Sequence, residues 1–131
     1  MRSIVLILAL FAGMGLVHAQ QAGPELSFET ETIDYGTIAH KSDGAREFKF
    51  TNTGNAPLVI TNAKGSCGCT VPTWPRDPIA PGESGVIQVK YATDRIGAFT
   101  KTVTLTTNAT EPVKVLTIRG NVLPPEPEKS N

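Results

Sequence analysis

The fold class is decided by the stretch EFKFTNTGNAPLVI, residues 47–60. Its first four residues alternate between charged and aromatic side chains, which places Phe48 and Phe50 on one face of a β-strand and the charges on the other. Residues 51–57 are rich in Thr, Asn, Gly and Pro, and most of these residue types favour turns. Residues 58–60 are apolar again. The stretch therefore predicts a strand with a buried phenylalanine face, a turn and a second strand.

Short strands separated by turns continue in both directions from this stretch. Upstream, residues 26–35 alternate apolar and polar side chains around a polar interruption and predict one broken first strand. Downstream, the alternation resumes in residues 87–91, 99–105 and 113–122. Since no helical segment is long enough to connect parallel strands, the pattern predicts an all-β, antiparallel sandwich of about seven strands. A small closed barrel is the alternative that periodicity alone leaves open.

The composition is that of one soluble globular domain. The chain has 131 residues, of which 40% are apolar and 18% are charged. Its 12 basic residues balance its 12 acidic residues, so the formal net charge is zero. That balance lacks the long-range field with which proteins attract nucleic acids or acidic membranes. We therefore expect no nucleic-acid partner.

Residues 1–19 have the organisation of a cleavable signal peptide. Arg2 supplies a basic start, residues 4–17 form an uncharged apolar run, and residues 17–19 (Val-His-Ala) are acceptable to a signal peptidase. Such a run spans roughly 21 Å as a helix, less than the roughly 30 Å of a bilayer core, although an uncleaved anchor is the alternative. We expect a mature chain without a stable membrane span, exported to the periplasm or the cell exterior, where thiols can oxidise.

The rest of the chain divides into a linker, one domain and a tail. Residues 20–25 are predicted to be the linker, and residues 26–122 the folded domain. Residues 123–131 contain three Pro and two Glu, a composition that buries little apolar area. It predicts a disordered, proline-rich tail.

Six short motifs follow one another along the predicted domain. They are DYGTI (34–38), FTNTG (50–54), APLVI (56–60), CGCT (67–70), IAPG (79–82) and GAFTKT (97–102). Together they resemble the bacterial secreted family known as domain-of-unknown-function family 1573, over roughly residues 26–122. The resemblance implies an immunoglobulin-like sandwich, similar to modules of major sperm protein and of cilium-associated proteins. It implies no reaction, and those distant relatives use such domains for binding or as scaffolds.

Cys67 and Cys69 are the two residues of the sequence that could most readily take part in chemistry, and three interpretations of this pair stay open. In a disulfide, the chain must bend to bring the Cβ atoms within about 3.8 Å, which Gly68 permits. Closing a loop this short contributes only about 1.6 kcal/mol, so the bridge would be weak and easily reduced. The alternatives are two buried free thiols, or a soft-metal site of the Cu(I) type. The mature chain offers one His and no Met, so a closed zinc site within one subunit would need carboxylates.

Trp74 is the candidate contact residue for a partner. It lies between Pro72 and Pro75, just after the cysteine pair, which indicates a loop position. Its ring could cap the end of the sandwich or be a partly exposed contact. If the cysteines act as reactive thiols, we expect both sulfur atoms to be accessible, with a basic residue such as Lys64 or Arg76 beside them.

No catalytic residue and no cofactor are expected. His40 is the one histidine of the predicted mature chain and lies in a polar loop. Ser66 lacks the Gly-x-Ser-x-Gly context of a nucleophile elbow. Lys101 falls on the apolar face of its strand, where we expect its stem to be buried and its amine to reach solvent.

The sequence therefore predicts a non-catalytic, exported module that binds an unknown protein or another envelope component. The alternative from a different class is a thiol-redox or Cu(I)-binding module that uses Cys67 and Cys69. An exposed apolar or aromatic patch near Trp74, or an unpaired edge strand, would favour the binding function.

The signal peptide gives a direct prediction. Because the apolar run is followed by an acceptable cleavage site, the exported protein should begin at Gln20. Mass spectrometry of the intact exported chain checks this. A mass that retains residues 1–19 would contradict it.

Overall fold

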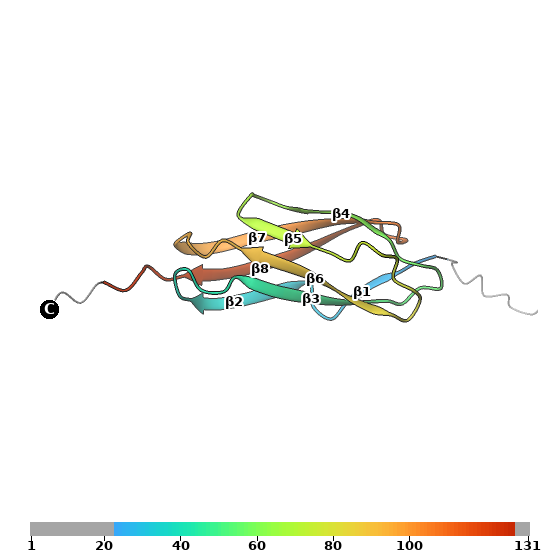
Figure 1. Cartoon of the computed structure of the whole chain (residues 1–131), viewed down its shortest axis with the longest axis horizontal. Helices are drawn as coiled ribbons and strands as arrows, with labels where there is room; N and C mark the ends of the chain where they lie inside the picture. The colour runs from blue at the N-terminus through green and yellow to red at the C-terminus, as the bar shows by residue number, and fades with distance from the viewer. Residues whose placement is uncertain (1–22, 128–131) are drawn as a thin grey trace, which may run out of the picture.

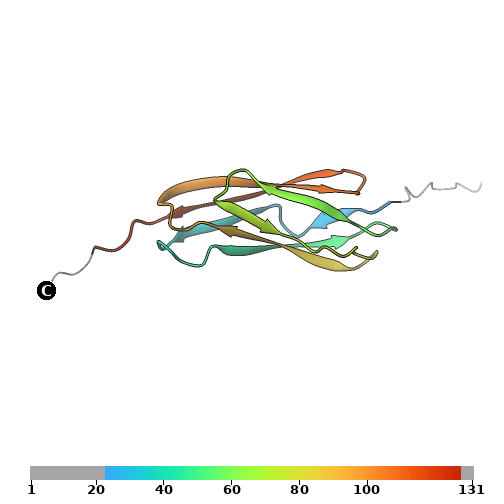
Figure 2. The ribbon, with the colours of Figure 1, turned by 45° about the horizontal axis from the view of Figure 1, so that its top comes forward.

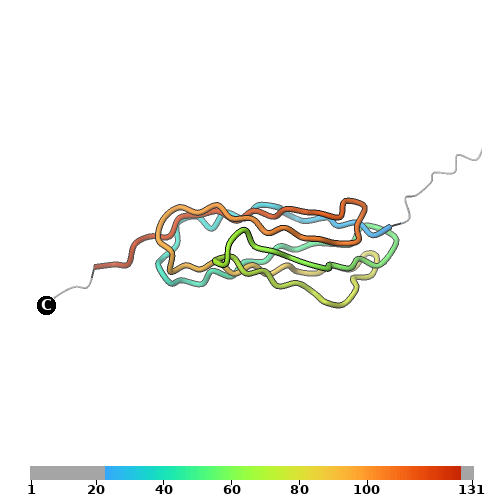
Figure 3. The backbone as a smooth tube through the Cα atoms, turned by 90° about the horizontal axis from the view of Figure 1, so that it is seen from above, coloured from blue at the N-terminus to red at the C-terminus, as the bar shows by residue number. Residues whose placement is uncertain are grey.

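The computed structural model describes residues 23–127, and in that range the chain forms eight β-strands and no helix. The strands are β1 (Leu26–Phe28), β2 (Thr32–Ile38), β3 (Ala45–Asn52), β4 (Ile60–Gly65), β5 (Thr70–Thr73), β6 (Ser84–Tyr91), β7 (Gly97–Thr107) and β8 (Val113–Val122). One sheet has the strand order β1-β3-β6-β5 and the other β2-β8-β7-β4 (Figure 1). The two sheets form the two layers of an immunoglobulin-like sandwich, with β7 and β8 along one side of Figure 3 and β3 and β6 along the other.

The core fills the space between the inner faces of the two sheets. On β3, the exposed fractions of Phe48 and Phe50 are 0% and 1%, whereas Lys49 between them is exposed. The opposite sheet contributes Leu116 and Ile118, at 0% and 1%. The prediction of a buried phenylalanine face on this strand is confirmed.

The predicted first strand is two strands that belong to different sheets. β1 pairs antiparallel with β3, the chain crosses between the layers at residues 29–31, and β2 then pairs parallel with β8. The prediction of one broken strand was therefore wrong, and the sandwich has one parallel pairing in an otherwise antiparallel arrangement. Periodicity locates an interruption, but it does not say which neighbour each half of the strand will find.

A second crossover connects the layers on the opposite side of the sandwich. β4 lies at the edge of one sheet and β5 at the edge of the other, and residues 66–69 carry the chain between them. This connection is the loop between the two green strands in Figure 2. The Cys-Gly-Cys motif thus lies at a crossover between the layers.

An aromatic cluster closes one part of the core. The ring of Tyr35 packs edge-on against Phe99, with centroids 5.4 Å apart, and Phe99 stacks on Tyr91 at 3.8 Å. The Tyr35 hydroxyl donates to the carbonyl of Gly44 at 2.7 Å, and burial raises the pKa of this phenol to about 12. A Cβ atom on Gly120 would come within 2.9 Å of Phe99. The aromatic residues of the DYGTI and GAFTKT motifs therefore serve packing.

The ends of the chain lie partly outside the described range. The predicted signal peptide, residues 1–19, is outside it. Of the predicted tail, residues 123–127 are exposed and have no regular secondary structure, and residues 128–131 are outside the described range. Within residues 23–127 there is no helix with the length and hydropathy needed to span a bilayer.

The buried face of β3 generates a stability prediction. Phe48→Ala should lower the free energy of unfolding by about 3–5 kcal/mol, because it removes a fully buried ring and leaves a cavity. Lys49→Ala, on the exposed face of the same strand, is the matched control and should change it by less than about 0.5 kcal/mol. Urea denaturation measures both. A loss below about 1 kcal/mol for Phe48→Ala would mean that this ring is not part of the core.

Candidate functional site

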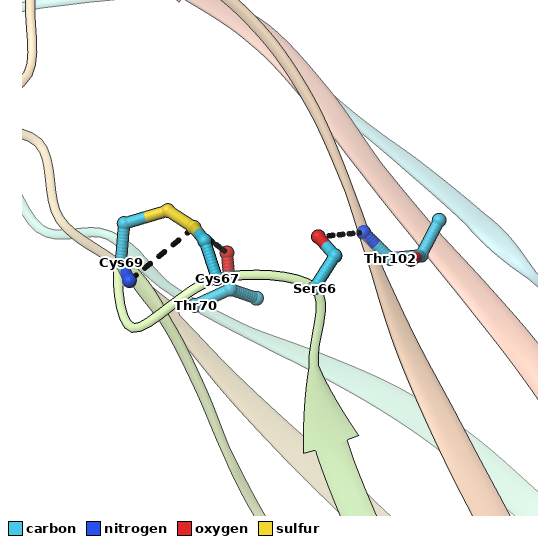
Figure 4. The surroundings of a disulfide bond; sticks show 5 residues. All are labelled: Ser66, Cys67, Cys69, Thr70 and Thr102. Atoms are coloured by element: carbon cyan, nitrogen blue, oxygen red, sulfur yellow. Dashed lines mark hydrogen bonds between the residues drawn. A yellow bond between two sulfur atoms is a disulfide. The ribbon is translucent and has the colours of Figure 1, made fainter.

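The cysteine pair lies in the tight connection between β4 and β5. The Sγ atoms of Cys67 and Cys69 lie at disulfide distance, and their Cα atoms are 5.2 Å apart. That separation is within the range of about 4.4–6.8 Å that a disulfide accepts, and it is reached because the chain turns at Gly68 (Figure 4).

Hydrogen bonds to neighbouring strands hold both ends of this turn. At the β4 end, Ser66 N–H donates to the Thr102 carbonyl at 2.8 Å, and Thr102 N–H donates to Ser66 Oγ at 3.1 Å (Figure 4). At the β5 end, Ala92 N–H donates to the Cys69 carbonyl at 2.9 Å. The turn is thus fixed to β7 on one side and to the end of β6 on the other, independently of the sulfur atoms.

The two sulfur-bearing side chains have different surroundings. Cys69 is buried, at 7% exposed, and belongs to the core, whereas Cys67 is partly exposed. The Thr70 hydroxyl lies 3.9 Å from Cys67 Sγ and 3.7 Å from Cys69 Sγ. A reagent from solvent can therefore reach Cys67 more easily than Cys69. A thiol-redox site was expected to have two accessible sulfur atoms, whereas here the Cys69 side chain is buried.

Two basic residues were expected beside reactive thiols. Lys64 is exposed on β4. Arg76 lies over the indole of Trp74, with its guanidinium carbon 3.9 Å from the ring centroid. The guanidinium of Arg76 therefore makes a cation–π contact with Trp74.

Among residues 23–127, no group of three or more His, Cys, Asp or Glu side chains could hold a metal ion. The cysteine pair thus brings two sulfur ligands together without a third donor of these types. Structural zinc sites use four protein ligands, and soft-metal sites commonly add His or Met to thiolates.

Trp74 has features of both positions expected from the sequence, a cap on the sandwich and a partly exposed contact residue. The indole is partly buried and packs against the core, and Arg76 covers its outer face. Its Nε1 is buried and has no hydrogen-bond partner among the described residues. Val71, on the edge strand just before it, is 54% exposed. We call Val71, Trp74 and Arg76 the β5 patch.

The remaining residues considered from sequence are spread over the molecule. His40 lies in the loop between β2 and β3 and lines a surface hollow with residues 123–126. Ser66 lies in the β4–β5 crossover, where its hydroxyl accepts a backbone hydrogen bond. Lys101 is half-buried on β7, between the buried Phe99 and Val103 on the same face, as expected.

Gly65 is a residue of the site that the sequence interpretation missed. A Cβ atom at this position would overlap the carbonyl oxygen of Thr70, so the crossover can close only around glycine. The available signal was a glycine two residues before the first cysteine of the motif.

Comparison with known families and structures gives a consistent picture of the fold. The profile of one family, described as "Protein of unknown function (DUF1573)", matches residues 26–122. No curated protein sequence matches the chain.

Solved structures share the architecture at low sequence identity. A protein of unknown function from Porphyromonas gingivalis W83 matches with a TM-score of 0.64 and 16% identity, over 83% of this chain and 51% of that one, so this chain spans about half its length. PapD-like domain 7 of human CEP192 matches at 0.60 and 8%, over 80% and 89% of the two chains. The CsuC–CsuE chaperone–tip adhesion subunit complex of Acinetobacter baumannii matches at 0.55 and 8%, over 75% and 57%. At such identities these likenesses establish the fold alone, and parts of two proteases of Vibrio cholerae, 32% and 24% of those chains, share it as well.

The crossover gives a prediction about what the cysteines contribute. Replacing both Cys67 and Cys69 by Ser should leave a folded, cooperative β-domain, because backbone hydrogen bonds hold the turn at both ends. Stability should fall by about 1–3 kcal/mol, mostly because a hydroxyl replaces the buried sulfur of Cys69.

Urea denaturation of the double variant, of the untreated protein and of the reduced protein separates the two causes. Reduction alone removes only the loop constraint and should cost no more than about 1.6 kcal/mol. A double variant that does not fold would show that the pair holds the domain together.

Proposed function

The chain belongs to the DUF1573 family, and from that premise we propose that it is a non-catalytic binding module that is exported to the cell envelope. Neither the family nor the sandwich fold determines a reaction, and the function of such a module depends on the residues at its surface. The observation that carries the proposal is the β5 patch: an exposed valine on an edge strand, followed by a half-buried tryptophan under an arginine.

Edge strands are where a sheet can meet another protein. Within the described part of the chain, β5 pairs only with β6, and Pro72 in its middle has no N–H to offer a further strand. Recognition at this edge would therefore use side chains more than backbone pairing. Trp and Arg are the residue types most enriched among the energetically dominant contacts of protein interfaces.

The charges around the patch indicate the chemistry of the partner. Arg76 lies on the patch itself, and the exposed Lys90 of β6 is directly opposite Val71 in the strand register. A protein surface that joins apolar and acidic residues would complement this arrangement.

Two further observations support a binding role over catalysis or thiol chemistry. His40 and Ser66 lie in different connections, and the Ser66 hydroxyl accepts a backbone hydrogen bond from Thr102. The burial of Cys69 favours a structural role for the cysteine pair. We propose that the pair is oxidised in the exported protein and fastens the crossover that leads into the patch.

Site-specific photo-crosslinking in intact cells tests this function. A photoreactive residue at position 71 of the full exported chain should give a discrete protein adduct. The same residue at position 96 is the matched control, because Ile96 is equally apolar and exposed, at 57%, but lies in the β6–β7 turn. Position 96 should give no adduct of that mass.

A second substitution tests whether the adduct depends on the β5 patch. Arg76→Ala should lower the yield from position 71 by about fivefold or more, since an interface arginine commonly contributes over about 1 kcal/mol. Arg95→Ala, an exposed arginine in the β6–β7 turn, should leave the yield unchanged. No adduct from position 71, or equal yields in the two variants, would contradict the proposed function.

A further inference from the structure

A short part of β8 has no strand beside it on one side. β2 pairs with β8 only from Thr117 onward, because the chain crosses between the sheets at residues 29–31. Among the residues that the structure describes, no strand pairs with residues 113–116 on the side facing away from β7. In Figure 1, β2 and β1 accordingly lie along different halves of the sandwich. We call the vacant strand position beside residues 113–116 the β8 notch.

Backbone hydrogen-bonding groups of β8 point into the notch. Thr107 N–H donates to the Pro112 carbonyl at 2.8 Å, and the register that follows directs the N–H and C=O groups of Lys114 and Leu116 toward β7. The alternate residues point the other way, as Thr117 shows by donating to the Glu31 carbonyl at 2.8 Å. The N–H and C=O groups of Val113 and Val115 therefore face the notch.

The side chains at the notch suit an added strand. Val113 and Val115 are 55% and 49% exposed and are β-branched, the side-chain type that packs well on a pleated surface. Next to their neighbour Lys114, on the inner side of the strand, lies a cavity of about 350 Å³ that is lined by Glu25, Leu26, Ala109, Thr110, Glu111 and Lys114. That volume lies within the range of about 300–1,000 Å³ typical of ligand sites.

The other sheet edges carry features that discourage strand addition. β5 contains Pro72, β1 is 3 residues long, and the pairings of β2 and β4 are interrupted by register shifts. The side chain of Lys114 is partly buried and forms an ion pair with Glu31. Among the described residues, the backbone groups of Val113 and Val115 make no hydrogen bond on the side away from β7, and residues 113–116 contain neither proline nor a register shift.

The charge around the notch identifies its occupant. Glu25 and Glu111 line the cavity next to Lys114, and the amine of Lys114 is already paired with Glu31, so the charges of these side chains are negative on balance. Two copies of this chain that paired through their notches would bring these carboxylates together, which like-charge repulsion disfavours. A lysine- or arginine-bearing strand would instead bring charges of the opposite sign.

We propose that the β8 notch binds an extended, cationic segment of a partner protein by strand addition. Main-chain hydrogen bonds to Val113 and Val115 would supply affinity, and Glu25 and Glu111 would select for basic side chains. The notch borders the crossover of β1 and β2, whereas the β5 patch lies at the opposite edges of the sheets. The proposal therefore adds a second surface and does not depend on the first.

Amide hydrogen exchange followed by NMR tests the notch directly. The probe is a synthetic seven-residue peptide of alternating Val and Thr with Lys at both ends, added to the mature chain. At a peptide concentration about 100-fold above its Kd, exchange at the amides of Val113 and Val115 should slow by up to about 100-fold. Lys114 and Leu116 are internal controls, because their amides already bond to β7. Binding that leaves Val113 and Val115 unprotected would overturn the proposal.

Charge reversal tests the selectivity. Glu25→Lys combined with Glu111→Lys should raise the Kd of the lysine peptide by about threefold to tenfold, since exposed ion pairs contribute little individually. Glu47→Lys combined with Glu83→Lys changes the net charge equally at exposed sites outside the notch and should leave the Kd unchanged. The same peptide with Glu in place of Lys should bind more weakly than the lysine peptide. Equal affinity of both peptides, or no saturable binding, would also overturn the proposal, whereas crosslinking from position 71 would be unaffected.

Discussion

One buried amide organises the end of the sandwich at which the described chain begins. The side chain of Asn52 has no exposed surface, and its Nδ2 donates to the carbonyls of Ala56 and Ile79 at 2.8 and 2.9 Å. Its Oδ1 accepts from the N–H groups of Gly54 and Glu25 at 3.0 and 3.2 Å. These four hydrogen bonds connect Asn52 to the turn after β3, to the entry of β1 and to the connection before β6. They hold the three segments in place relative to one another, because a buried backbone group that loses its partner costs about 1–3 kcal/mol. The position of β1, and with it the crossover to β2, depends on this amide.

Two of the connections between the layers, those that join edge strands, then determine which surfaces the molecule presents. On one side, the chain passes from β4 to β5 through the cysteine turn, and the β5 patch follows within a few residues. On the other side, the passage from β1 to β2 takes the first strand away from β8 and leaves the notch. A sandwich whose first strand stayed in one sheet would have no vacant position beside Val113 and Val115. The same topological device, a chain that changes layers at the sheet margin, thus produces both candidate contact surfaces.

The sequence predicted those features that depend on local alternation and missed those that depend on strand pairing. Phe48 and Phe50 were placed correctly because strict period-two alternation leaves one choice of buried face. Cys67 and Cys69 were singled out because two cysteines so close together are chemically unusual. Asn52 was not, because the segment Asn-Thr-Gly predicts a turn, and only the tertiary structure buries the side chain of this Asn. The β8 notch could not be foreseen, since it arises from the absence of β2 beside one half of β8.

The position of the chain ends gives the sandwich a mechanical character. The described part of the chain begins at one end of the long axis and finishes at the other, and the strands run nearly parallel to that axis (Figure 1). A tension between the two ends would therefore load the backbone hydrogen bonds between β8 and its neighbours β2 and β7 in shear, all at once. Strands pulled apart sideways lose these bonds one after another, at a much lower force. Strung between two anchored components, the domain would thus transmit tension along its length before it extended.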